Sequence, residues 1–233
     1  MPKQNALLTS ETFRFFRDLG RHNSKEWMDS NRGRYQEHVV QPFRRLLEAL
    51  SPAVLALDPR FDTGGRTGVN FSRINRDIRF AKDKTPYSAQ MYLKFPAQGA
   101  KGWQAGQLYV GISAETVTVG FRVYADEASK ASVLAQIARP RVLKNPKWLP
   151  QQKRRLGRRY ESYWYSMEKR EWTKHAGWPL AADDWKKLLG WVVRKKLTAS
   201  AATRPSFPRD AARIFHDLFP LYRFTTLRAR AAN

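Results

Sequence analysis

Two adjoining segments of alternating hydrophobicity constrain the fold more than any other feature of the chain. Between residues 107 and 125, apolar side chains occupy every second position, with polar or small residues among the others. This period of two is typical of β-strands with one buried face. Because only Ala114–Glu115 separates the two segments, they favour an antiparallel hairpin. We therefore predict strands at Gln107–Ser113 and Thr116–Ala125, and a third at Met91–Phe95.

The first 57 residues have the period of amphipathic helices instead. Ser10 is suited to cap a helix in which apolar residues recur at three-residue spacing up to Leu19. Asn23 followed by Glu26 matches a capping box, which predicts that a second helix begins there. A third apolar stripe consists of Val39, Phe43, Leu46, Leu47 and Leu50.

The C-terminal part is expected to be helical again. The apolar residues of Trp185–Leu197 keep helical spacing after Asp183–Asp184, which suit the positive start of a helix. Pro208 predicts the start of another helix, and residues 223–233 are expected to form a loose tail. The order of helices, antiparallel sheet and helices indicates the α+β class. We expect one α+β domain over residues 1–222, helical at 10–57, with the sheet at 69–125 and a helical, basic part at 126–222.

Positive charge dominates the composition. The 233 residues carry a formal net charge of +23, and residues 127–233 hold 24 basic but only 8 acidic residues. Such a surface attracts anions, of which nucleic acid, a membrane face and an acidic protein are all examples. Charge alone does not choose among these three.

Several classes of function are disfavoured by what the sequence lacks. The chain has no cysteine, which excludes disulfides and thiolate chemistry and fits a reducing cytoplasm. Its four histidines share no metal-ligand spacing, so we expect neither a metal site nor a cofactor. No apolar run is long enough to span a bilayer, and the N-terminus has no signal-peptide pattern. We therefore expect a cytoplasmic protein.

The stretch RINRDIRFAKDKTPY, residues 73–87, places five cations among apolar residues. If residues 71–80 are extended, one face holds Ile74, Ile78 and Phe80 together with Ser72 and Arg76, and the opposite face holds Arg73, Asn75, Asp77 and Arg79. The cations and their two carboxylates are Arg73, Arg76, Arg79, Lys82, Lys84, Asp77 and Asp83. The excess of cations favours an anionic ligand.

Asp77 lies between two arginines and can orient one of them through a bidentate pair, which leaves the other free for a ligand. Lys82 and Lys84 follow in a turn, because Pro86 disfavours helix at the preceding residue, and form an electrostatic rim. The alternative is architectural, since Arg–Asp networks also fix loops to neighbouring elements.

This segment also resembles the signature of an uncharacterised bacterial and fungal family, domain of unknown function 2461. The matching positions are Phe13–Phe16, Asn23, Trp27, Tyr35, Pro42–Phe43, Arg73, Arg76, Asp77, Arg79, Phe80, Asp83, Lys84, Thr85, Pro86 and Tyr87. The resemblance covers roughly residues 1–125 and the closing Phe219–Tyr222. It implies no activity or cofactor, so a function has to be argued from the residues. Asn23, Trp27 and Tyr87 are the positions at which a pocket beside the network would converge.

A second basic segment, Lys144–Trp172, interleaves cations with aromatic rings. Proteins that bind single-stranded nucleic acid use cations to contact phosphates and flat aromatic rings to stack on bases. The candidate contacts are Lys153, Arg154, Arg155, Arg158, Arg159 and Trp164. The alternative is a solvated basic helix whose aromatic residues pack inward.

We expect a protein that binds an anionic ligand, with nucleic acid favoured. An enzyme acting on a phosphorylated or carboxylated small molecule is the alternative, with Asp77 or Asp83 as the reacting carboxylate and the arginines as clamps. Neighbouring arginines should lower the pKa values of both carboxyl groups, which argues against general-base chemistry. A purely structural network is the third interpretation.

Overall fold

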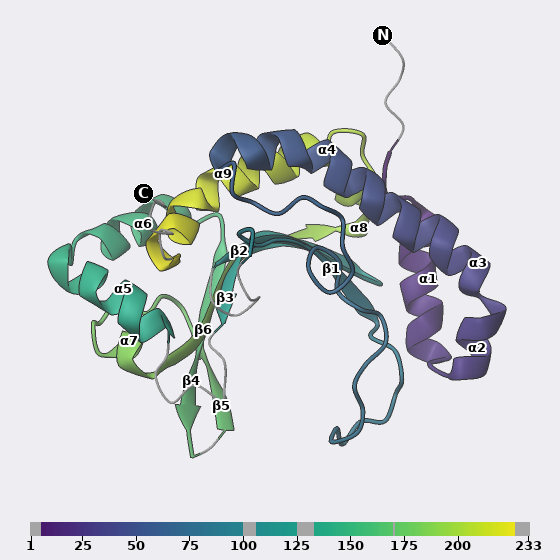
Figure 1. Cartoon of the computed structure of the whole chain (residues 1–233), viewed down its shortest axis with the longest axis horizontal. Coiled ribbons are helices and arrows are strands. Elements are labelled where there is room, and N and C mark those ends of the chain that lie inside the picture. Colours follow the sequence, from purple (N-terminus) through teal and green to yellow (C-terminus); the bar gives the residue numbers. More distant parts are fainter. Residues whose placement is uncertain (1–5, 100–105, 125–132, 170, 227–233) are drawn as a thin grey trace, which may run out of the picture. The chain divides into compact units, whose positions relative to one another are not determined.

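The computed structural model describes residues 6–99, 106–124, 133–169 and 171–226. These residues form an α+β fold, as predicted, with N-terminal helices, a six-stranded antiparallel sheet and C-terminal helices (Figure 1). The chain divides into two compact units. The first takes Met1–Phe95, Tyr109–Val119 and Lys196–Arg213, and the second takes Pro96–Leu108, Gly120–Lys195 and Ile214–Asn233.

The N-terminal helices of the first unit bury an aromatic core. They are α1 (Ser10–Arg21), α2 (Lys25–Ser30), α3 (Arg32–Tyr35), the π-helix η1 (Gln36–Val40) and α4 (Gln41–Leu57). Phe15 is fully buried, and its ring contacts those of Phe16, Trp27 and Tyr35. Helix α2 is capped by Ser24, whose side chain accepts from the Trp27 amide, and not by Asn23 as the capping-box pattern predicted.

The predicted hairpin is present. Its strands are β2 (Gln107–Ser113) and β3 (Thr116–Tyr124), and β1 (Gln90–Phe95) precedes them. The predicted end of the second strand, Ala125, lies outside the described residues. The strands hydrogen-bond in the order β1-β2-β3-β6-β4-β5. Within the first unit, the Tyr35 hydroxyl reaches Met91 of β1, which ties the helices to the sheet.

Residues 69–89 were expected to belong to the sheet, and this prediction is wrong. They form a long loop between α4 and β1, with isolated bridges only, among them Asn75 to Tyr87. Figure 1 shows this loop extending well beyond β1. The reason is that its polar side chains bond to the loop's own backbone and compete with a strand ladder.

Besides parts of β2 and β3, the second unit contains helices and three further strands among the described residues. The helices are α5 (Val133–Lys144), α6 (Trp148–Leu156) and α7 (Asp184–Lys187), and the strands are β4 (Glu161–Glu168), β5 (Glu171–Ala176) and most of β6 (Leu188–Thr198). Strand β4 pairs antiparallel with both β5 and β6. Helices α8 (Ala199–Ala202) and α9 (Phe207–Thr225) follow.

The prediction of a helix at Trp185–Leu197 is wrong. Helix α7 ends at Lys187, and strand β6 begins at Leu188. The apolar run is buried on both faces, and such a run fits a helix or an inner strand equally well. Its aromatic and β-branched residues, Trp191, Val192 and Val193, favour the strand. The predicted tail also begins too early, since α9 continues to Thr225, while residues 227–233 lie outside the described residues.

Candidate functional site

Residues 73–87, which we call the signature loop, form a hairpin-like projection in the first unit. Its stem is closed by two backbone hydrogen bonds, from the Arg76 amide to the Pro86 carbonyl at 2.8 Å and from the Ser88 amide to the Ile74 carbonyl at 2.7 Å. Residues 77–85 form the tip. The sequence therefore builds an ordered projection from a segment that is neither helix nor strand.

Asn23 docks this stem onto the helices. Its side-chain amide donates to the Tyr87 carbonyl at 2.8 Å, and its side-chain oxygen accepts from the Tyr87 amide at 3.0 Å. Tyr87 is buried. Both residues were predicted to belong to a ligand site, and here the Asn23 side chain and the Tyr87 backbone hold the loop in place.

Arg76, Asp83 and Thr85 form a brace across the loop. The Arg76 guanidinium donates to the Asp83 carboxylate at 2.6 Å and to the hydroxyl and carbonyl oxygens of Thr85. The Thr85 amide in turn donates to Asp83 at 2.9 Å. This backbone bond, followed by the Arg76 bond, lowers the pKa of Asp83 from 3.8 to about 2. For Arg76, the architectural interpretation fits the contacts.

The tip has its own internal bonds. Asp77 accepts a bidentate pair from Arg79, at 3.0 and 2.7 Å, and this pair lowers the pKa of Asp77. The Lys84 ammonium donates to the Ile78 carbonyl at 3.0 Å and so closes the turn. The pairing of Asp77 with one arginine agrees with the prediction. Arg73 is exposed, and its side chain makes no ion pair or hydrogen bond within the described residues.

Phe80 stands at the tip with 94% of its surface exposed, the largest exposed fraction among the large apolar residues of the described chain. The prediction that Phe80 shares one apolar face with Ile74 and Ile78 is wrong, because bends interrupt the segment and Phe80 is exposed whereas Ile74 is buried. One cation of the tip lies close to the ring. The Arg79 guanidinium is 5.8 Å from the ring centroid, and Lys82 is exposed.

A shallow polar pocket of about 410 Å³ lies beside the brace. It brings together several predicted site residues with one residue of β2, namely Asn23, Arg76, Asp83, Thr85, Tyr87 and Ser113. Trp27 does not line it, since its ring packs on Phe15 and His22. The lowered pKa values of Asp77 and Asp83 keep both carboxylates charged and make them weak general bases. No group of three His, Asp or Glu side chains that could hold a metal occurs in the described chain.

The residues of the second predicted surface, in the second unit, fall into two groups: some pair with other parts of the protein, and others line a groove. Arg155 and Arg159 contact Asp217 of α9, with Arg159 at 2.9 Å, and the Tyr160 hydroxyl donates to the same carboxylate at 2.7 Å. Burial, then this hydrogen bond, raises the pKa of Tyr160. These two arginines therefore attach α6 and the following turn to α9.

The remaining cations of this surface line a groove of about 850 Å³. Lys153, Arg154 and Arg158 face it together with Trp178 and Leu180, and all three cations are exposed. Trp164 of β4 is not part of this lining, and its ring stacks on that of His175 at 4.1 Å between centroids. Sequence reasoning missed Trp178, and the motif that could have indicated it is the Gly177-Trp178-Pro179 turn after a strand.

The fold and these surfaces define a basic α+β protein with a braced, cation-rich loop and a basic groove lined by an aromatic ring. The chain belongs to the family described as conserved hypothetical protein (DUF2461), whose model matches residues 11–224. The match extends the predicted resemblance from the first 125 residues to nearly the whole chain.

No curated protein matches this chain. Among the described residues, no helix combines the length and the apolar character that crossing a membrane requires. The function therefore has to be argued from the loop and the groove.

Proposed function

We propose that this protein binds nucleic acid, in the cytoplasm, through the tip of the signature loop. Phe80 stacks on an unpaired base or wedges against a base step, while Arg73, Arg79 and Lys82 contact phosphates. The observation that carries this proposal is the exposed Phe80 ring among cations on an ordered projection. Single-stranded or locally unpaired nucleic acid is favoured because its bases are free to stack.

The exposure of Phe80 needs a functional reason. A large apolar ring in water forfeits the stabilisation that burial gives, of about 1.5–3 kcal/mol for a side chain of this size. The hydrogen bonds of the Arg76 brace and of Lys84 fix the turn that carries the exposed ring. An ordered tip loses little entropy on binding, which favours affinity.

The cations of the signature loop, Arg79 and Lys82 at the tip and Arg73 at the base, fit the same role. Arg79 is oriented by Asp77 yet remains largely exposed, and Arg73 and Lys82 are free of carboxylates in the described chain. A phosphate approaching the tip displaces no internal partner of Arg73 or Lys82. This arrangement supports backbone contact without base specificity.

The groove of the second unit supplies a second, separate contact in this proposal. Lys153, Arg154 and Arg158 are suited to phosphates, and Trp178 offers a flat ring on the same surface. Arg155, Arg159 and Trp164, which were expected to contact nucleic acid, are engaged elsewhere and are left out of the proposed interface.

Fluorescence anisotropy titration with single- and double-stranded oligonucleotides, at several salt concentrations, tests the proposal. We expect saturable binding that weakens steeply with salt, and a loss of about fivefold to 150-fold in affinity for Phe80→Ala, which corresponds to about 1–3 kcal/mol per stacked base. Leu143→Ala, which removes another exposed apolar side chain (54% exposed), is the matched control and should leave affinity unchanged.

Flat isotherms near physiological ionic strength would contradict the proposal. An equal affinity of wild type and Phe80→Ala would remove the role of the loop tip even if oligonucleotides bind. Binding to anionic lipid vesicles without binding to oligonucleotides would assign the exposed ring to a membrane surface instead.

A further inference from the structure

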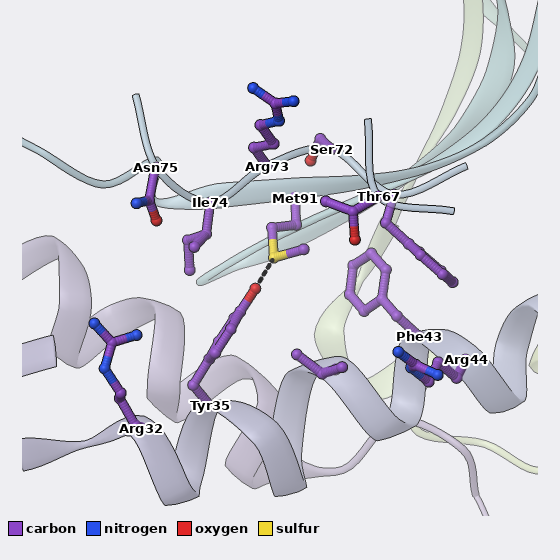
Figure 2. Close-up of a pocket in the computed structure, with 12 residues that line it drawn as sticks. Arg32, Tyr35, Phe43, Arg44, Thr67, Ser72, Arg73, Ile74, Asn75 and Met91 are labelled. Carbon is purple, nitrogen blue, oxygen red and sulfur yellow. Dashed lines mark hydrogen bonds between the residues drawn. The ribbon is translucent and has the colours of Figure 1, made fainter. Parts of the chain in front are cut away.

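A second cavity, distinct from the loop tip, lies in the first unit between the helices and the base of the signature loop. Its volume is about 430 Å³, within the range of small-molecule sites. Figure 2 shows the side chains of Tyr35, Phe43, Ile74 and Met91 pointing toward one another across it. The other apolar members of its lining are Val40 and Phe71.

A π-helical turn shapes one wall of this cavity. Segment η1 joins α3 to α4, and its closing bond runs from the Gln41 amide to the Gln36 carbonyl, five residues back. In an α-helix, residues five apart point in different directions, whereas the wider turn brings Tyr35 and Val40 to one side. Both line the cavity. Such insertions are less stable than α-helix and are frequent at functional sites.

The cavity offers one hydrogen-bond donor that has only a weak partner. The Tyr35 hydroxyl reaches the Met91 sulfur at 3.6 Å, and a thioether is a poor acceptor. Burial raises the pKa of Tyr35, so the hydroxyl keeps its proton at neutral pH. A ligand oxygen would be a better acceptor than the sulfur.

Cations border the helix side of the cavity. Figure 2 shows Arg32 and Arg44 at its two ends, whereas the Arg73 guanidinium points away from the aromatic side chains. Arg32 is paired with Asp29 at 2.7 Å. Arg44 is exposed and makes no ion pair within the described chain.

We infer that this cavity binds a small aromatic carboxylate. Its ring packs between Phe43, Phe71 and the Met91 sulfur, and its carboxylate faces Arg44. The aromatic walls favour a flat body, and the absence of any carboxylate among the lining residues favours an anion. Arg73 lines the cavity and also belongs to the proposed nucleic-acid interface, but its guanidinium points away from the aromatic side chains. The inference does not depend on that interface, because none of Phe80, Arg79 and Lys82 lines the cavity and the proposed carboxylate contact is Arg44.

Isothermal titration calorimetry with 2-naphthoate tests this inference on the full chain. We expect saturable binding of 2-naphthoate and much weaker binding of 2-naphthamide, which has the same ring but no charge. Arg44→Met should weaken naphthoate binding by about threefold to tenfold, in keeping with a partly exposed charged hydrogen bond. Arg45→Met is the control, since it removes the same charge from the adjacent exposed residue, which does not line the cavity.

Two blocking variants show whether naphthoate enters the cavity. Val40→Trp fills it from the helix side and Thr67→Trp from the loop side, so a folding defect in one leaves the other as a test. Loss of naphthoate binding in a folded blocking variant is the expected result. Undiminished binding in both folded variants, or equal binding of the acid and the amide, would overturn the inference, as would the absence of binding to wild type.

Discussion

At the scale of single residues, Asn23 shows how a polar side chain positions the candidate site. Its two hydrogen bonds to the Tyr87 backbone are partly buried, and removing them leaves a donor and an acceptor without partners. Asn23→Ala should therefore lower the free energy of unfolding by about 1–3 kcal/mol. Asn75→Ala, at an exposed asparagine of the same loop, should change it by less than about 0.5 kcal/mol. Equal effects in urea denaturation would show that Asn23 does not hold the loop.

Asp83 gives the brace a dependence on pH. Because the Thr85 amide and the Arg76 guanidinium lower its pKa to about 2, the ionised form is favoured in the folded loop. Its contribution is present above the ordinary pKa of 3.8 and is lost as the pH falls through about 2. We expect the protection of the Thr85 amide from hydrogen exchange to decline over this acid range in wild type. Asp83→Asn should show low protection at every pH, and a wild-type profile identical to that of Asp83→Asn would contradict the brace.

The signature loop also shows which contacts can be predicted from residues alone. A carboxylate flanked by arginines two and four positions away predicts a bidentate pair, and Asp77 forms one with Arg79. The exposure of Phe80 could not be predicted in the same way. It depends on the Arg76 and Lys84 bonds, which turn the chain at the tip and end the strand-like alternation on which the prediction rested.

At the scale of secondary-structure elements, segments with one buried face were predicted well. Strand β3 alternates in burial over most of its length, and α1 lies where its spacing predicts, although Thr9 and not Ser10 is its N-cap. Strand β2 was also predicted correctly, because its sequence alternates even though nearly all of its residues are buried. Strand β6 was mistaken for a helix because its N-terminal half is buried throughout and therefore has no period. Its identity depends on partners distant in the sequence, such as Trp164 of β4 opposite Trp191.

Gly190 tests the position of β6. A Cβ atom at this residue would lie 2.5 Å from the ring of Tyr124, so Gly190→Ala should lower the free energy of unfolding by about 1–3 kcal/mol. Gly20→Ala is the reference, because a Cβ there meets nothing within 4 Å and alanine favours the helix. We expect it to raise stability by up to about 1 kcal/mol. Thermal unfolding of both variants distinguishes the strand from the predicted helix, in which Gly190→Ala would be stabilising.

At the scale of the whole molecule, the net charge of +23 gives long-range attraction to polyanions, while local geometry decides which cations make contact. Lys82 is exposed at the tip and lacks an ion pair in the described chain, so Lys82→Ala should reduce the salt dependence of oligonucleotide affinity by about one phosphate contact. Arg155→Ala should leave this slope unchanged, since Arg155 donates to the Asp217 carbonyl within the protein. An unchanged slope for Lys82→Ala together with a reduced slope for Arg155→Ala would place the phosphate contact on the second unit and not on the loop.

The central claim is that the ring of Phe80 meets a nucleic-acid base. Photo-crosslinking to a bromodeoxyuridine-substituted single strand, followed by mass spectrometry of the adducts, tests it most directly. We expect an adduct at Phe80 that disappears when unlabelled single strand competes. Adducts confined to other parts of the chain, with an unmodified Phe80 at saturating oligonucleotide, would contradict it.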